Sequence, residues 1–102
     1  MSENCATQEV TVVNVQGLHA RPAHAFVTVA NQFDSEIEVE KAGERVDGKS
    51  ILSILTLAAA QGTRLIIRAR GADAGEAVAA LARLIEQGFN EDEAGQPLGE
   101  VG

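Results

Sequence analysis

The sequence has no tryptophan, no tyrosine and only one cysteine among its 102 residues. A single cysteine cannot form an internal disulfide, and we expect Cys5 to be incidental rather than catalytic. Basic residues are also scarce: eight Lys and Arg stand against fifteen Asp and Glu, which gives a net charge of −7. Proteins that bind nucleic acid carry a basic stripe on their surface. The composition therefore argues against a nucleic-acid partner and favours protein partners.

Long apolar runs are absent as well. No stretch approaches the roughly 18 consecutive apolar residues that a membrane span requires. The N-terminus lacks a basic segment followed by an apolar one, which is the pattern of an export signal. We therefore expect a cytoplasmic protein that does not associate with a membrane.

The length of the chain predicts one domain. Residues 1–8 are mostly polar, and we expect them to form a flexible leader. Residues 90–102 hold four acidic residues and no basic residue, together with three glycines and one proline. That composition is typical of a disordered tail. The folded domain is therefore predicted to span residues 9–89.

Two hydrophobic periods alternate within this domain. Alternating or β-branched residues predict strands at 9–15, 36–40, 45–46 and 64–70. Apolar residues spaced three and four apart predict three helices, whose core-facing sets are Ala23, Phe26, Val27 and Ala30; Ile54, Leu57 and Ala58; and Ala77, Val78, Leu81, Leu84 and Ile85. The predicted fold is α+β in the order βαββαβα, with three helices on one face of a four-stranded antiparallel sheet.

Three residues mark the ends of these helices. Ser50 precedes the second helix and is a plausible N-cap, because its hydroxyl can accept a hydrogen bond from the first turn. Asp73 precedes the third helix with Glu76 three residues later, which resembles a capping box. Gly88 is expected to end that helix.

The segment from Gly17 to Pro22, Gly-Leu-His-Ala-Arg-Pro, places His19 where the first strand gives way to the first helix. Pro22 fits the first helical turn, where an N–H has no partner within the helix. The amides of Ala20 and Arg21 are expected to point toward whatever His19 carries, and the guanidinium of Arg21 matches phosphate oxygens.

Histidine suits phosphoryl transfer at this position. Its unperturbed pKa of about 6.5 keeps a neutral, nucleophilic ring nitrogen available at cellular pH without a neighbouring base. We therefore predict His19 as the phosphoryl acceptor and Arg21 as the residue that stabilises the phosphate, with backbone help from Ala20 and Arg21.

The same segment carries a family resemblance. From Val10 to Phe89 the chain resembles HPr, the histidine-phosphorylated carrier of the bacterial phosphoenolpyruvate-dependent phosphotransferase system. The matching landmarks are Gly17-Leu18-His19-Ala20-Arg21-Pro22-Ala23, Gly48-Lys49-Ser50-Ile51-Leu52, Leu55-Thr56-Leu57-Ala58 and Gln87-Gly88-Phe89. The resemblance implies the open-faced β-sandwich of that family.

It also implies a role and partners. His19 would accept a phosphoryl group from Enzyme I and pass it to an EIIA-type domain, as a stoichiometric, monomeric carrier without a cofactor rather than as a turnover enzyme. The sequence leaves two branches open, sugar uptake or its regulation and a nitrogen-type regulatory relay.

The start of the second helix permits two interpretations. In the resemblance, Ser50 aligns with a serine that HPr kinase/phosphorylase modifies in some lineages, yet its capping role already explains a serine there. Ile51, Leu52 and Leu55 exceed what one buried stripe requires, and with Ala20 they are predicted to form a docking surface for partner proteins.

Other functional classes are less well supported. His24 follows His19 by five residues, which is not the helical spacing at which two histidines share a metal, and we predict no metal site. The pattern from Gly43 to Ser50 matches a P-loop, but it carries two acids and is needed for a hairpin. Two alternatives remain. A phosphorylation-independent regulatory binding module would bind its partner even without His19. A small His-dependent phosphotransferase or hydrolase would turn over a small phosphoester as the isolated protein.

Overall fold

The structure is a computed structural model that describes residues 4–90. Within that range the chain forms four strands and three α-helices, followed by a short 3-10 turn. In chain order they are β1 (Cys5–Thr11), α1 (Ala20–Ala30), β2 (Glu36–Lys41), β3 (Glu44–Asp47), α2 (Ile51–Thr56), β4 (Arg64–Arg70), α3 (Ala74–Glu86) and η1 (Gly88–Asn90). The predicted order βαββαβα is confirmed.

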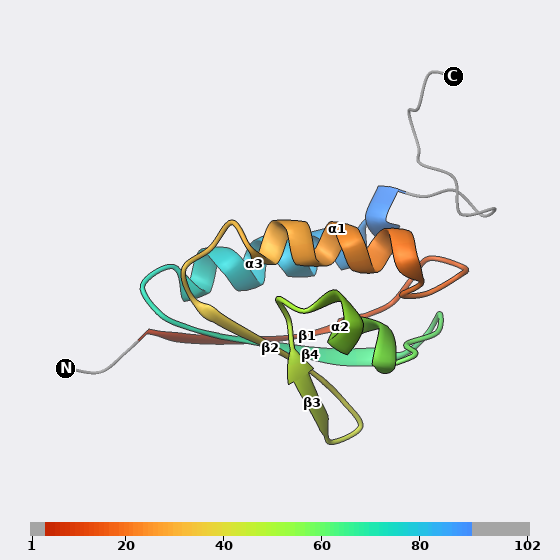
Figure 1. The fold of residues 1–102 in the computed structure, drawn as a ribbon, viewed down its shortest axis with the longest axis horizontal. Helices are drawn as coiled ribbons and strands as arrows, with labels where there is room; N and C mark the ends of the chain where they lie inside the picture. Colours follow the sequence, from red (N-terminus) through yellow and green to blue (C-terminus); the bar gives the residue numbers. More distant parts are fainter. Residues whose placement is uncertain (1–3, 91–102) are drawn as a thin grey trace.

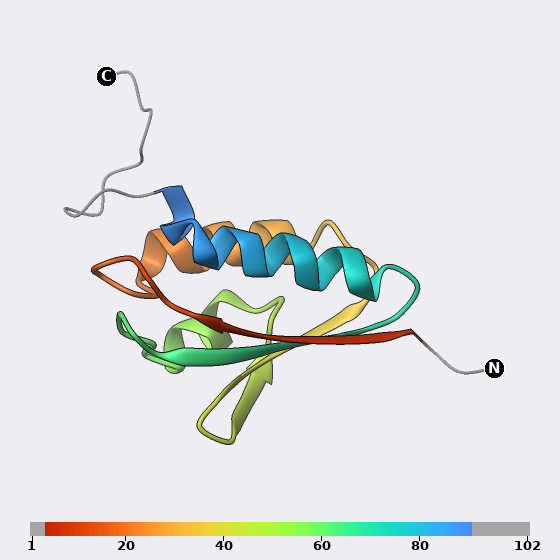
Figure 2. The ribbon, with the colours of Figure 1, turned by 180° about the vertical axis from the view of Figure 1, so that it is seen from behind.

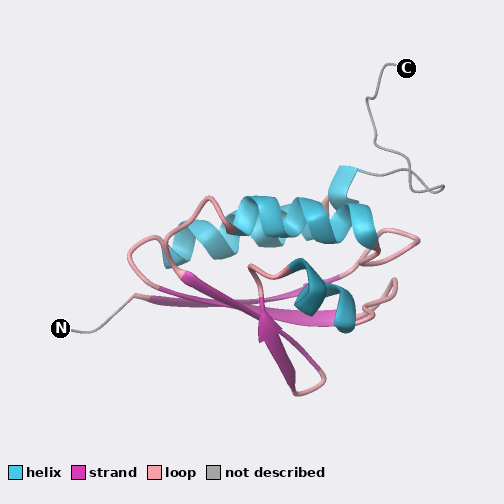
Figure 3. Ribbon diagram, in the orientation of Figure 1, coloured by secondary structure: helices cyan, strands magenta, loops and turns pink. Residues whose placement is uncertain are grey.

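The four strands form one antiparallel sheet in the order β1-β4-β2-β3. All three helices lie on the same face of the sheet, and the opposite face is left open (Figures 1, 2 and 3). This is the open-faced sandwich that the sequence predicts. The central strands, β4 and β2, are contributed by segments far apart in the chain.

The core lies between the sheet and the helices. Strand β4 shows why: Leu65, Ile67 and Ala69 are buried beneath the helices, while its arginines lie on the opposite face, as the alternation predicts. Each large apolar side chain buried in this way contributes about 1.5–3 kcal/mol. From the helices come Phe26, Ile54, Leu81 and Ile85, all essentially inaccessible to solvent.

The first strand lies earlier in the chain than predicted. It begins at Cys5 rather than Glu9, so that residues 5–8 belong to the sheet instead of a flexible leader, and it ends at Thr11 rather than Val15. Pairing with the whole of β4, from Cys5 opposite Arg70 to Thr11 opposite Arg64, accounts for this. An edge strand with one open face tolerates polar residues. Of the predicted acidic tail, only Asn90 lies within the described residues.

The second helix is shorter than its apolar spacing suggests. It ends at Thr56, with Leu57 as its C-cap. Ala58 then adopts a left-handed conformation with φ +49 and is exposed, so its predicted place in the core is wrong. Ala59 is buried instead. The left-handed residue interrupts the helical spacing, so the burial that this spacing predicts does not continue past Leu57.

Asp73 precedes α3 as predicted, but its side chain makes no capping bond to that helix. The carboxylate instead accepts hydrogen bonds from the backbone amides of Asp34 and Ser35, both at 2.9 Å, and from the Ser35 hydroxyl at 2.5 Å. These bonds, that of the Ser35 hydroxyl above all, lower the pKa of the Asp73 carboxyl below its ordinary value of 3.8. Asp73 thus joins the start of α3 to the segment that leads into β2.

This arrangement predicts a pH-dependent contribution to stability. A carboxyl whose pKa is lowered by folding stabilises the protein above its unfolded pKa, and the contribution is lost as the pH falls through the folded value. We expect Asp73→Asn to lower the melting temperature at pH 7, and the difference from the parent to shrink as the pH falls below 3.8 and through the lowered pKa of the folded state. Paired thermal melts across this range test it. A gap that stays constant down to the lowest pH would contradict the proposed ionic hydrogen bonds.

Candidate functional site

His19 occupies the N-cap of α1, as the sequence predicts. Its backbone is extended, with φ −81 and ψ −169, and its carbonyl accepts the first helical hydrogen bond from the Ala23 amide at 2.9 Å. The amides of Ala20 and Arg21 therefore precede the helical hydrogen-bond ladder. Pro22 lies buried in the first turn, while Ala20 and Arg21 are exposed and His19 is half-buried.

The electrostatics of this helix start favour an anion. The N-terminus of a helix carries a partial positive charge and amides directed along its axis. No acidic residue lies in the first turn of α1 to neutralise that charge. Arg21 adds a permanent cation two residues after His19. The structure thus brings together the two predicted site residues, His19 and Arg21, at the start of one helix.

The turn before His19 is held by the segment that follows α2. Gly17 has φ +68, and a Cβ there would lie 2.3 Å from the Ala59 carbonyl oxygen. The next amide, that of Leu18, donates to the same oxygen at 2.9 Å. On the other side, the buried Asn14 donates through Nδ2 to the Gly17 carbonyl at 2.8 Å. The backbone that delivers His19 is therefore clamped from two directions.

These clamping residues were not identified from the sequence. Ala59 contributes only a backbone oxygen, which no side-chain pattern can reveal. Asn14 gives only a weak signal, because it is a polar residue within a largely β-branched run that predicts a strand. The loop that replaces the predicted strand end contains two exposed valines, Val13 and Val15.

Ser50 is the N-cap of α2, as predicted. Its hydroxyl oxygen accepts from the Ser53 amide at 3.3 Å, and its carbonyl accepts from Ile54 at 3.0 Å. The six-residue helix is about 9 Å long, and the segment after its far end supports the turn before His19. Ser50 and His19 are thus linked through one short helix.

The residues predicted for docking differ in exposure. Leu52 has 73% of its surface exposed, the largest value among the large apolar side chains described. Ile51 and Leu55 are half-buried and pack partly against the core, and Ala20 is exposed. Helices α1 and α2 are in contact (Figure 1). Leu52 is therefore the residue of this set with the most apolar surface available to a partner.

His24 lies on the exposed side of α1, and its carbonyl accepts from Thr28 at 2.8 Å. Within residues 4–90, no three His, Cys, Asp or Glu side chains are grouped so that they could hold a metal ion. None of the helices in this range is long and apolar enough to cross a membrane.

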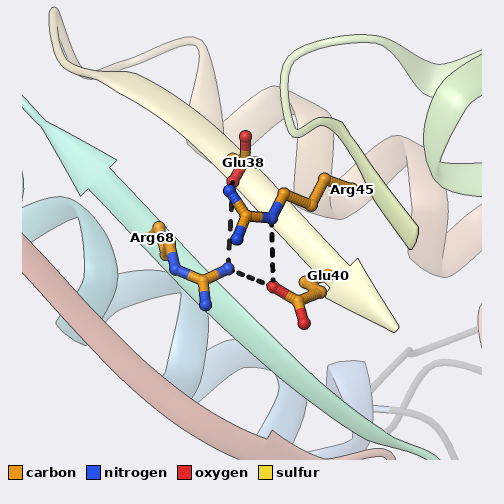
Figure 4. Close-up of polar contacts among 4 residues, drawn as sticks. All are labelled: Glu38, Glu40, Arg45 and Arg68. Atoms are coloured by element: carbon orange, nitrogen blue, oxygen red, sulfur yellow. Dashed lines mark hydrogen bonds and ion pairs between the residues drawn. The ribbon is translucent and has the colours of Figure 1, made fainter. Parts of the chain in front are cut away.

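A cavity of about 300 Å³ lies on the open face of the sheet, away from His19. It is lined mainly by Arg45, Arg68, Arg70, Glu36 and Glu38. The guanidinium groups of Arg45 and Arg68 contact the carboxylates of Glu38 and Glu40 (Figure 4), and Arg70 pairs with Glu36. A hydrogen bond from Arg68, with smaller effects of Arg45, lowers the pKa of Glu40. Counting Glu40, three arginines and three glutamates pair here, and they join β2, β3 and β4 rather than form an anion site.

Proteins of known family are similar in sequence to most of this chain. A family model described as the PTS HPr component phosphorylation site matches residues 6–87. The Phosphocarrier protein HPr of Neisseria meningitidis is 45% identical over 86 residues, covering 84% of this chain and 97% of that protein. The HPr-like protein Crh of Bacillus subtilis is 41% identical over 80 residues, which cover 78% of this chain and 94% of that protein.

The fold is shared with solved structures of the same kind. A crystal structure of HPr from Thermoanaerobacter tengcongensis superposes with a TM-score of 0.82 at 42% sequence identity. The alignment covers 85% of this chain and 98% of that one. The match therefore extends over almost the whole length of the relatives and includes the helix start that carries His19.

Proposed function

Because this chain belongs to the HPr family of phosphotransferase-system phosphocarriers, we propose that His19 accepts a phosphoryl group from Enzyme I and passes it to an EIIA-type domain. The observation that carries this proposal is the placement of His19 at the N-cap of α1, with Arg21 beside it and no acid in the first turn. The chain acts as a stoichiometric carrier, since each phosphoryl group must leave on a partner before the next arrives.

The chemistry needs little from the carrier beyond a nucleophile and a positive environment. A neutral ring nitrogen of His19 attacks phosphorus as the bond between phosphorus and the donor breaks, and the other ring nitrogen keeps its proton. In the second step the acceptor attacks and the bond to His19 breaks. Negative charge on the moving group is stabilised by the guanidinium of Arg21 and by the amides of Ala20 and Arg21.

The partners follow from the proposed role. Enzyme I and the EIIA-type domain would both dock on the surface formed by Ala20, Ile51, Leu52 and Leu55, with Leu52 contributing the most exposed apolar area. We propose that the carrier works as a cytoplasmic monomer in sugar uptake or its regulation. The alternative branch is a nitrogen-type regulatory relay, and the identity of the EIIA domain that accepts the phosphoryl group distinguishes the two.

The test of the proposal is the chemistry of the attached phosphate. Incubation with Enzyme I and phosphoenolpyruvate should add one phosphate per chain, labile in acid and stable in base, as a phosphoramidate is. Intact-mass measurement before and after each treatment follows it, and adding an EIIA domain should remove it. An acid-stable phosphate, or none, would refute the proposal.

A second candidate, a regulatory binding module that works without phosphorylation, is favoured by one observation, the exposure of Leu52 on α2. Such a module would bind its partner equally well when His19 is absent. Binding that depends on Leu52 but not on the phosphorylation of His19 would favour this candidate.

Ser50 offers a way to regulate the same surface, where a dedicated serine kinase is present. We expect Ser50→Asp to weaken the complex with Enzyme I by about 1–3 kcal/mol, because the added charge must be desolvated against an apolar partner surface. Stability should change little, since aspartate is a good N-cap and its charge favours the helix dipole.

The matched control is Ser50→Ala, which removes the cap without adding charge. It should lower stability by about 1 kcal/mol and leave the affinity for Enzyme I unchanged. Calorimetric titration together with thermal melts separates the two effects. Wild-type affinity in Ser50→Asp would place Ser50 outside the docking surface and remove the regulatory interpretation.

A further inference from the structure

Lys41 is a charged residue on the face of β2 that the helices cover. Ile37 and Val39 of β2 are buried beneath the helices, and the alternation places Lys41 on that same face. Its side chain is half-buried, and its Nζ donates a hydrogen bond to the Leu57 carbonyl oxygen at 2.7 Å. An inward-facing lysine must find an acceptor for its charge, and here that acceptor is the end of α2.

The Leu57 carbonyl lies at a structurally weak point. Leu57 is the C-cap of a helix of only six residues, and the next residue, Ala58, is left-handed. The last carbonyls of a helix have no partner within it, and a cation there is favoured by the helix dipole. A helix this short depends on tertiary contacts for its stability. Lys41 therefore anchors the point at which α2 ends.

Two residues further on, the same segment supports the phosphorylation site. The Ala59 carbonyl oxygen accepts the Leu18 amide at 2.9 Å and packs against Gly17 so closely that no Cβ fits. Leu18 immediately precedes His19. A continuous path thus runs from Lys41 through the end of α2 to the backbone that sets the position of the imidazole.

We propose that Lys41 is a positioning residue for phosphoryl transfer: it holds the 57–59 segment on which the Gly17–Leu18 turn rests, and so it fixes His19 for reaction. The inference rests on the proposed function of His19, but the positioning itself can be measured without any phosphoryl transfer. A small misplacement of the reacting group is costly, because catalysis here depends chiefly on positioning and electrostatic stabilisation.

The chain offers a matched control in Lys49. It is also half-buried, and its Nζ donates to a backbone carbonyl at the same 2.7 Å, but to that of Phe33, beyond the C-terminal end of α1. The length of α1, about 16 Å, separates that end from His19. Lys41→Met and Lys49→Met each remove one ammonium that donates to a backbone carbonyl. Only the first should disturb the turn before His19.

The first measurement is amide hydrogen exchange of Leu18, compared in the same sample with that of Ile67, a fully buried residue of the inner strand β4. In Lys41→Met the Leu18 amide should exchange about 10-fold faster relative to Ile67 than in the parent, because it depends on the Ala59 carbonyl. Lys49→Met should leave this ratio unchanged, and Lys41→Arg should restore most of it. An unchanged ratio in Lys41→Met, or an equal change in Lys49→Met, would overturn the proposal.

The second measurement is the rate of His19 phosphorylation by Enzyme I. Lys41→Met should lower kcat several-fold and leave KM for the carrier nearly unchanged, because Lys41 is not part of the docking surface. A rise in KM alone would show that Lys41 acts on docking and would overturn the positioning role. If the parent protein itself is not phosphorylated, the proposed function fails, while the Leu18 exchange ratio still decides whether Lys41 positions the turn.

Discussion

His19→Ala is expected to abolish phosphorylation by Enzyme I and phosphoenolpyruvate. The substitution removes the nucleophilic nitrogen and leaves the helix start intact, and no neighbouring residue of the motif supplies a nucleophile in its place. Alanine should be tolerated structurally, because histidine is not among the favoured N-cap residues and the His19 side chain makes no capping bond to α1. We expect the variant to remain folded.

The control for this experiment is His24→Ala. His24 is the only other histidine in the sequence and lies exposed on α1, five residues after His19. The His24→Ala variant should be phosphorylated with the same stoichiometry as the parent protein. Intact-mass measurement of both variants, with circular dichroism to confirm folding, completes the test. Equal labelling of His19→Ala would assign the phosphate to another residue and refute the site.

Gly17→Ala is expected to produce the largest loss of stability among single changes near the site, about 3 kcal/mol. Part of the loss, about 1 kcal/mol or more, comes from placing alanine at φ +68. The rest comes from the new Cβ, which would lie 2.3 Å from the Ala59 carbonyl oxygen and must push the two segments apart. That movement also breaks the hydrogen bond from Leu18, so phosphorylation of His19 should slow as well.

Gly43→Ala separates the two contributions. Gly43, in the turn between β2 and β3, also has positive φ, +89, but a Cβ there would meet nothing within 4 Å. Gly43→Ala should lower the stability only by the conformational part, about 1 kcal/mol, and leave phosphorylation of His19 unchanged. Urea unfolding of the three proteins gives the comparison. Equal losses in both variants would show that the contact with Ala59 contributes nothing.

The alternation of residues along the strands was sufficient to predict the sheet and its faces. Leu65, Ile67 and Ala69 are buried as their spacing requires, because successive side chains of a strand point to opposite faces whatever the rest of the chain does. The extent of β1 was predicted less well. Residues 5–8 look like a leader when taken alone, and they become a strand because β4 provides hydrogen-bond partners along its whole length.

The helix caps also differ in whether the local sequence is enough to predict their hydrogen bonds. Ser50 caps its own helix, as predicted, because both partners lie within four residues of each other. Asp73 was expected to cap α3 in the same way, but its carboxylate bonds instead to Asp34 and Ser35, almost forty residues earlier in the chain. No local pattern contains that competing partner. The tertiary fold brings the amides of Asp34 and Ser35 close to Asp73, and its carboxylate accepts hydrogen bonds from them.

The sequence by itself determined which residues form the candidate reactive site of this protein. His19, Arg21 and Pro22 lie within four consecutive residues, so the local start of a helix is enough to bring the imidazole, the guanidinium and the helix N-terminus together. Only the tertiary structure decided how that site is held. The Ala59 carbonyl accepts from the Leu18 amide just before His19, and the half-buried Lys41 donates to the carbonyl of Leu57, two residues before Ala59. Contacts of this kind depend on how the segments pack, since a backbone oxygen is the same in every residue and leaves no trace in the order of side chains.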